Sequence, residues 1–244
     1  NAKKLEEGLR AVLDEYQKKD IATVQVSQVI PGETLVIRFA ELPVVANEVR
    51  GLVTVPVDEA LKLIDVPMGE VGRISRIQET LLKLSRSVYF SQAKVSPEVV
   101  AEGVKLVWDL VERKVLPEPT PLQGIRVVGV TILPLDRVQA LLGSLPQGNV
   151  SNFDVLRALS GLYNYYRREG YFLVDFLGKT VENGVLVVEV REGKLGRVEI
   201  KGATRTADWV ILRVLGLRPG QILTEARLTV ARQNLMSLGY FSDV

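Results

Sequence analysis

Apolar residues recur along the chain at the spacing of one helical face. Residues 5–16, 74–88 and 228–238 place them three and four positions apart, so each stretch predicts an amphipathic helix that buries one stripe. A shorter helical pattern lies near residues 58–64, 135–142 and 207–215. The pattern therefore predicts long helices and shorter helices ahead of them.

Pairs of short runs rich in β-branched residues lie between the helical segments, and each pair is joined by a glycine-containing turn. They predict three hairpins, which pair residues 21–29 with 34–39, 92–101 with 104–111, and 171–181 with 185–190. The third hairpin is the clearest, because Asn183-Gly184 supplies both positive-φ positions of a tight type I′ turn. Helices and hairpins together predict the α+β class.

Three further extended segments end in a glycine, and their spacing indicates an internal repeat. Gly51, Gly129 and Gly202 close residues 47–51, 125–129 and 198–202, and they lie 78 and 73 positions apart. A helix follows each segment and ends in a tyrosine-phenylalanine pair, 38, 42 and 38 positions after the glycine. These pairs are Tyr89-Phe90, Tyr171-Phe172 and Tyr240-Phe241. The agreement predicts a unit of strand, helix, helix, strand and strand.

Counting the units gives two complete copies and two partial ones. We expect a second helix and hairpin over residues 1–42, complete copies over 43–116 and 117–194, and a first strand with two helices over 195–244. Residues 116–121, Leu-Pro-Glu-Pro-Thr-Pro, should form the stiffest extended connector, because each proline fixes φ and removes a donor.

Composition excludes several classes of function. Hydrophobic residues make up 47% of the chain and charged residues 25%, which is typical of a folded globular protein. The 31 basic and 29 acidic residues are scattered, which disfavours nucleic-acid binding. Cysteine and histidine are absent, so disulfides, the commonest metal ligand and the commonest general base are removed. We expect no enzyme, no cofactor and no metal site.

The ends of the sequence predict that it is part of a longer protein. No run approaches the roughly 20 apolar residues that cross a bilayer, and residues 1–7 lack the apolar core of a secretory signal. We expect any signal peptide or anchor to lie outside this segment. The last copy stops at Val244, where its second strand should begin.

Two glycine motifs invite a functional reading. Gly178-Lys179-Thr180 resembles the end of a phosphate-binding loop, but the position five residues before Gly178 holds Leu173 instead of the glycine that the loop needs. Gly170 and Gly239 follow the last apolar residue of a helix, where a left-handed C-cap favours glycine. We interpret the first motif as part of a strand and the other two glycines as helix caps.

The remaining candidates are carboxylates and aromatic residues. Asp58 and Glu59 lie in an early helical turn, where carboxylates complement the helix dipole. We expect Trp108 to pack inward from a strand, and Trp209 to face either the core or a neighbouring domain. The aromatic pairs after the helices should fill the gap between helix and sheet.

The repeated unit resembles the polypeptide-transport-associated (POTRA) domain, which has a glycine after its first strand and Gly-Tyr-Phe before its second. The most specific stretch combines residues 196–202 and 215–220 with Gly239-Tyr240-Phe241, and it is similar to POTRA domains of the BamA-type outer-membrane assembly factors. Residues 165–172, which end in Gly170-Tyr171-Phe172, are similar to POTRA domains of both assembly factors and two-partner secretion transporters.

This resemblance implies tandem POTRA domains, each a three-stranded mixed sheet covered by two helices. It implies a periplasmic location ahead of a C-terminal transmembrane β-barrel, with the domains binding unfolded outer-membrane barrel precursors and accessory subunits. Two alternatives remain open. One is the POTRA region of a two-partner secretion or envelope protein-import transporter, and the other is a structural spacer or scaffold that positions accessory subunits.

In this family the second strand lies at the sheet edge, where unpaired N–H and C=O groups can add an extended peptide as another strand. The candidate edges are residues 92–100 and 171–180. The candidate peptide-binding residues are Gln92, Lys94, Ser96, Tyr171, Leu173, Asp175, Leu177 and Lys179. The glycines of the repeat and the Gly-Tyr-Phe residues are expected to be structural.

Overall fold

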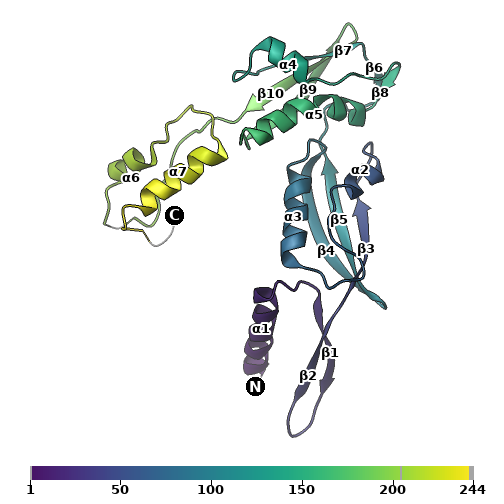
Figure 1. Cartoon of the computed structure of the whole chain (residues 1–244), viewed down its shortest axis with the longest axis vertical. Helices are drawn as coiled ribbons and strands as arrows, with labels where there is room; N and C mark the ends of the chain where they lie inside the picture. The colour runs from purple at the N-terminus through teal and green to yellow at the C-terminus, as the bar shows by residue number, and fades with distance from the viewer. Residues whose placement is uncertain (1, 204, 242–244) are drawn as a thin grey trace. The chain divides into compact units, whose positions relative to one another are not determined.

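The computed structural model describes residues 2–203 and 205–241. The chain divides into two compact units, Asn1–Arg113 and Lys114–Val244, so the division falls three residues before the predicted boundary after residue 116. Helices and small mixed sheets alternate in both units, which confirms the α+β class (Figure 1).

The first unit contains a partial copy followed by a complete one. The partial copy consists of α1 (Ala2–Lys18) and the antiparallel pair β1 (Val24–Ile30) and β2 (Val36–Glu41). The complete copy consists of β3 (Val44–Arg50), α2 (Val57–Leu61), α3 (Ile74–Ser85), β4 (Phe90–Val100) and β5 (Gly103–Glu112). Its sheet has the order β3-β5-β4, in which β3 is parallel and β4 antiparallel to β5.

The core of this complete copy is built around Trp108. Its side chain is fully buried, as are those of Leu84 from α3 and Phe90 from β4. The indole Nε1 donates a hydrogen bond to Asn47 Oδ1 over 3.0 Å, which satisfies its polar atom inside the core. The expectation that Trp108 packs inward is confirmed.

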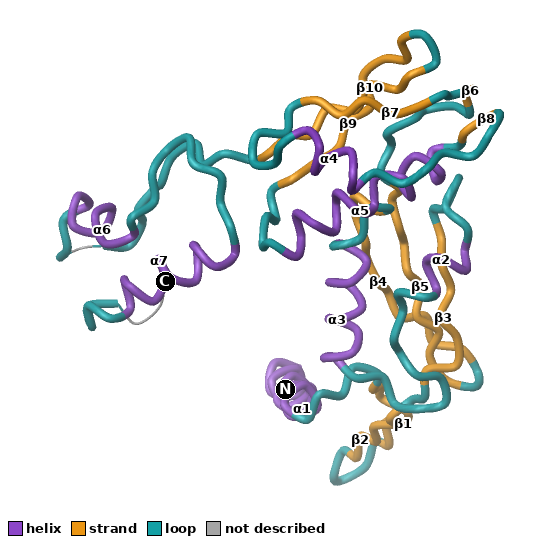
Figure 2. Tube along the Cα trace, turned by 45° about the horizontal axis from the view of Figure 1, so that its top comes forward, coloured by secondary structure: helices purple, strands orange, loops and turns teal. Residues whose placement is uncertain are grey.

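The second unit repeats the same architecture. Its complete copy contains β7 (Gly124–Val128), α4 (Leu135–Leu141), α5 (Asn152–Arg168), β9 (Val174–Glu182) and β10 (Val185–Glu192), with the short pair β6 (Thr120–Pro121) and β8 (Asn149–Val150). The sheet order is β7-β10-β9, with β7 parallel and β9 antiparallel to β10. In both complete copies the long helix, α3 or α5, lies against the sheet of its own copy (Figure 2).

Residues 194–241 form the last, partial copy, which contains α6 (Asp208–Leu215) and α7 (Glu225–Met236). Residues 198–201, where the repeat predicts a first strand, are not a strand in the structure. The physical reason is that the described residues offer no neighbouring strand, because the equivalents β3 and β7 pair with a third strand of their own copies.

The repeat glycines confirm the alignment of the copies. Gly51, Gly129 and Gly202 have φ values of 86°, 84° and 79°, and none of them lies in a helix. A Cβ on Gly51 would lie 2.2 Å from the carbonyl oxygen of Leu110, and one on Gly129 would lie 2.5 Å from that of Val190. Since both oxygens belong to the third strand of their own copies, the two glycines permit the same close approach of backbone to backbone.

Gly170 and Gly239 adopt the left-handed conformation predicted for helix caps, with φ values of 79° and 68°. After Gly170 the Tyr171 N–H donates to the carbonyl of Tyr166, and this bond continues the helix end. β9 therefore begins only at Val174, and the prediction that a strand starts at Tyr171 is wrong by three residues.

The proline-rich connector is also different from the expectation, because much of it is built into the second unit. Val115 and Leu116 are buried, and both backbone N–H groups donate to Asn152 Oδ1, over 2.9 and 3.0 Å. Thr120 and Pro121 form β6. The segment is therefore anchored by hydrogen bonds and is not only stiffened by its prolines.

Candidate functional site

The hairpin strands β4 and β9 lie at sheet edges. Among the described residues, β4 pairs only with β5 and β9 pairs only with β10. One side of each strand therefore has backbone N–H and C=O groups outside the ladder. These edges are the surfaces on which an extended peptide could be added.

Register determines which residues of β4 face outward. A two-residue turn joins Val100 to Gly103, so the backbone N–H and C=O groups of Val100 point toward β5. From there along β4, the backbone groups of successive residues point alternately away from β5 and toward it, and we call this alternation the phase of the strand. Ala93, Val95, Pro97 and Val99 therefore direct their backbone groups away from β5. The predicted residues Gln92, Lys94 and Ser96 have the opposite phase, so their N–H groups belong to the ladder.

Pro97 interrupts the open edge of β4. It has no N–H, and it is tolerated in the strand because it stands in the outward phase, opposite Leu106. An added peptide would lose one donor in the middle of this edge. Pro97 is visible in the sequence, but only the register shows that its missing N–H group is one that would point away from β5.

The edge of β9 carries no proline. The turn between Glu182 and Val185 sets the phase, which places the backbone groups of Val174, Phe176 and Gly178 outward. A β-bulge follows, where the register shifts between Leu186 and Val188. β9 thus has an unbroken outward row over its first half and an irregular, exposed second half.

The structure separates the predicted residues of this edge. Asp175 and Leu177 lie on β9 with their N–H groups directed toward β10, and Lys179 lies in the bulge. Tyr171 and Leu173 precede the strand. The outward backbone groups instead belong to residues whose side chains face inward, because the direction of the N–H and the side of the Cβ alternate together along a strand.

The motif Gly178-Lys179-Thr180 has a structural explanation. A Cβ on Gly178 would lie 1.7 Å from the carbonyl oxygen of Val115, which belongs to the segment held by Asn152. Only glycine permits this approach. The motif lies inside β9, as expected, and not at a helix N-terminus where a phosphate would bind.

Sequence reasoning missed a buried carboxylate at the end of each third strand. Glu112 ends β5 and accepts hydrogen bonds from the backbone N–H groups of Val53, Thr54 and Val55, and from the Thr54 hydroxyl. Burial alone raises the pKa of Glu112, but the Thr54 hydroxyl and the three N–H groups outweigh it and hold the pKa below its ordinary value. The carboxylate thus fixes the loop that follows β3.

Glu192 ends β10 and does the same in the second unit. It accepts from the Thr131 hydroxyl, from the N–H groups of Thr131 and Ile132, and from the buried Tyr166 hydroxyl over 2.6 Å. Burial raises the pKa of Glu192, but hydrogen bonds led by those of Thr131 and Tyr166 lower it overall. Burial and the same carboxylate raise the pKa of Tyr166.

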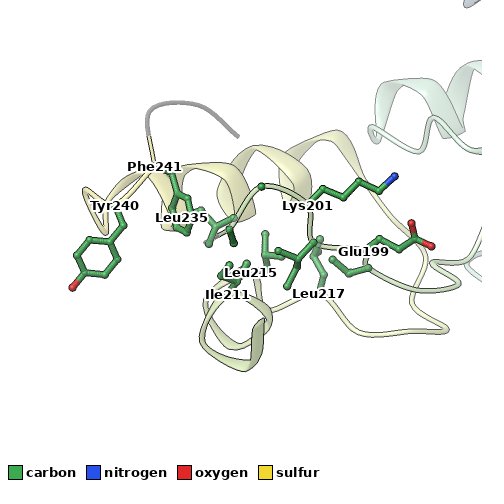
Figure 3. A pocket seen from close by; sticks show the side chains of 12 residues that line it. Glu199, Lys201, Ile211, Leu215, Leu217, Leu235, Tyr240 and Phe241 are labelled. Carbon is green, nitrogen blue, oxygen red and sulfur yellow. The ribbon is translucent and has the colours of Figure 1, made fainter. Parts of the chain in front are cut away.

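The last copy has an open apolar cleft of about 550 Å³ between residues 198–203 and its two helices. Ile211, Leu215 and Leu235 line it, and Phe241 lies beside Leu235 (Figure 3). In the complete copies the hairpin packs at this place. Tyr240 is 72% exposed and points away, so the expectation that this aromatic pair fills the gap fails for Tyr240.

The outer face of the first unit's sheet is charged. Arg50 and Lys105 each form ion pairs with both Glu48 and Glu98, at distances between 2.6 and 3.1 Å. In the described part of the chain, no group of three or more acidic side chains is arranged to hold a metal ion. No helix there has the length and apolarity to span a membrane.

Comparison with known families identifies the class of domain. The model described as "POTRA domain, ShlB-type" matches residues 120–193, and the POTRA model described as "Surface antigen variable number repeat" matches residues 194–244. Together they cover more than half of the chain. The chain therefore belongs to the POTRA-domain family, and its POTRA domains stand in tandem.

Parts of this chain are also similar to individual proteins. Over 132 residues, half of this chain, the sequence is 30% identical to a putative outer membrane protein assembly factor of Treponema pallidum (strain Nichols), of which it spans 15%. The N-terminal domain of Omp85 from Thermosynechococcus elongatus is 22% identical, with a TM-score of 0.41 over 83% of this chain and 88% of that one. POTRA1-3 of Omp85 from Anabaena is 24% identical, with a TM-score of 0.38 over 84% and 89%.

Proposed function

We propose that this chain is the periplasmic, client-handling region of an outer-membrane protein assembly factor, and that it holds extended barrel precursors by strand addition at β9. The observation that carries the proposal is the unbroken outward row of β9, at Val174, Phe176 and Gly178. Main-chain hydrogen bonds do not depend on the sequence of the partner, which suits a receptor for many unfolded clients. The likeness to an assembly factor supports the assignment of clients.

β9 is favoured over β4 because of Pro97. A peptide on β4 would meet a missing donor in the middle of the edge, whereas the corresponding part of β9 offers both N–H and C=O at every outward residue. The exposed half of β9, residues 178–182, is also accessible for the peptide to continue. Accessory subunits would then bind surfaces other than this edge.

The phase of β9 selects the variant that tests the proposal. Val174 and Phe176 are core residues and Gly178 has no room for a side chain, but Val181 faces outward beyond the bulge and is 43% exposed. Val181→Pro removes one outward donor and leaves the ladder to β10 intact. We expect binding of a peptide copied from a barrel strand to weaken about two- to tenfold, the effect of one hydrogen bond.

Val181→Ala is the matched control, because it shortens the same side chain and retains the N–H. Fluorescence anisotropy with the labelled barrel peptide would compare the two variants, and circular dichroism would verify that both are folded. Equal affinity of Val181→Pro and the parent, together with unchanged hydrogen exchange at the outward amides of Val174, Phe176 and Gly178, would show that strand addition at this edge is not the mechanism.

A second candidate is the POTRA region of a two-partner secretion transporter. The observation in its favour is the ShlB-type model that matches residues 120–193. The two candidates share the β9 edge and differ in the client. Competition between an outer-membrane barrel peptide and a peptide from a secreted partner would separate them, because the stronger competitor identifies the client class. A scaffold that binds neither would show no competition.

A further inference from the structure

A second surface lies on the helical side of the last copy, between α6 and α7. It is a groove of about 390 Å³ with an apolar lining that includes Leu217, Ala226 and Val230. Three polar side chains also line it, Gln221 from the loop before α7 and Arg227 and Asn234 from α7 itself. The groove shares Leu215 and Leu217 with the cleft on the sheet side, and none of its lining residues belongs to β9.

The complete copy of the first unit shows what occupies the same place there. The copies align residue by residue with an offset of 151, because the bonds from Val44 N–H to the Glu70 carbonyl and from Gly69 N–H to the Val44 carbonyl recur in the last copy. There they join Leu195 to Gln221 and Gly220 to Leu195, over 2.8 and 2.7 Å. The alignment makes Asp65 equivalent to Gly216, and Arg76 equivalent to Arg227.

Asp65 neutralises the basic residues of its helix in the first unit. Its carboxylate accepts from Arg76 Nη1 over 3.2 Å and from Lys83 Nζ over 3.1 Å. The hydrogen bond and the charge of Lys83, followed by the charge of Arg76, hold the pKa of Asp65 below its ordinary value. A carboxylate between loop and long helix is therefore part of this arrangement.

The last copy lacks that carboxylate, because Gly216 stands in the place of Asp65. Arg227 Nη1 meets the neutral Gln221 Oε1 over 3.4 Å, a long contact for a guanidinium. Gln221 Nε2 is buried and has no hydrogen-bond partner within residues 2–203 and 205–241. Gln221 therefore brings a buried amide donor without an acceptor to the lining of the groove, beside the guanidinium of Arg227. Such a donor is unfavourable.

In the complete copy of the second unit, the space between the short and the long helix is closed by direct contact of the two helices. Gly161 lies nine residues before the cap Gly170, and a Cβ there would be 2.4 Å from the carbonyl oxygen of Leu141, so α4 packs directly on α5. The residue nine positions before Gly239 is Val230, which is 53% exposed. A valine at this position prevents such an approach, and the groove stays open.

We propose that this groove docks an apolar segment of a partner protein that carries an aspartate or glutamate, whose carboxylate takes the place that Asp65 occupies in the first unit. Charge supports an acidic partner, because residues 195–244 contain seven lysines and arginines against four aspartates and glutamates. The proposal is independent of strand addition at β9, and it stands if that mechanism fails.

The test uses the 244-residue chain and two blocked peptides, acetyl-Leu-Asp-Leu-amide and acetyl-Leu-Asn-Leu-amide, which differ only in charge. NMR chemical shifts of the Gln221 side-chain amide report binding at the groove. We expect the aspartyl peptide to shift this signal with an affinity at least about tenfold above that of the asparaginyl peptide, because its hydrogen bonds are charge-assisted. Arg227→Gln should remove the difference.

Arg213→Gln is the matched control, since Arg213 is an exposed arginine of the same copy that does not line the groove. The backbone spectrum of each variant establishes its fold. Equal shifts with both peptides, no shift with either at millimolar concentration, or an unchanged response in Arg227→Gln would overturn the proposal. Self-association of the chain that Arg227→Gln abolishes would assign the groove to a second copy and overturn it too.

Discussion

At the scale of single residues, the two buried carboxylates Glu112 and Glu192 hold the repeat together. Each joins the end of a third strand to the loop after the first strand, a separation of about 60 residues in sequence. A glutamate at a strand end gives no local signal of burial, so the sequence did not reveal this role. The glycines were predictable because their backbone requirement is local.

Replacing Glu192 by glutamine tests this interpretation. The variant keeps the size of the side chain but weakens the hydrogen bonds to Thr131, Ile132 and Tyr166, so we expect the free energy of unfolding at pH 7 to fall by about 1–3 kcal/mol. Urea unfolding followed by circular dichroism measures it. Glu189→Gln, at a half-buried position of the same strand whose carboxylate pairs with the more exposed Lys179 and Arg191, should have a smaller effect.

The difference in the free energy of unfolding between the parent and Glu192→Gln should depend on pH. Since the folded state lowers the pKa of Glu192, its contribution is present above the unfolded value of about 4.3 and is lost as the pH falls through the folded value. The difference between parent and Glu192→Gln should therefore shrink in acid. A difference that stays constant from pH 7 to strongly acidic pH would contradict the assignment.

At the scale of elements, the sequence predicted most of the fold because the periodicities of the long helices and hairpins are strong. The turn at Asn183-Gly184 has positive φ at both residues, 48° and 76°, as predicted. Element starts were less predictable, since the helix cap continues through Tyr171 and delays β9. The candidate edges were found, but the phase of their N–H groups needed the register.

Pro97 leaves the edge of β4 without one outward N–H group, and this can be tested. Pro97→Ala restores an outward donor in the middle of β4 without touching the ladder, so we expect this edge to bind the barrel peptide about two- to tenfold better than in the parent. Ser96→Ala, in the inward phase, is the control. Crosslinking of the peptide to β4 would distinguish this gain from binding at β9. No gain at β4 would mean that Pro97 does not protect the edge.

At the scale of the whole molecule, the chain is a tandem array in which each complete copy buries its own core. The repeat was predictable from spaced glycines and aromatic pairs, and the family models match its second half. Residues 198–201 were not predictable as unpaired, because a strand forms only where a neighbour completes its ladder. By the same rule, a peptide added to β9 as we propose would satisfy its outward N–H and C=O groups.

Amide hydrogen exchange along β9, with and without a bound barrel peptide, tests strand addition most directly. If the peptide adds to β9 as a strand, the outward N–H groups of Val174, Phe176 and Gly178 will exchange more slowly when it is present. Asp175 and Leu177, whose N–H groups already belong to the ladder with β10, should exchange slowly in both states. Saturating peptide that leaves the outward amides as fast as before would contradict strand addition at β9.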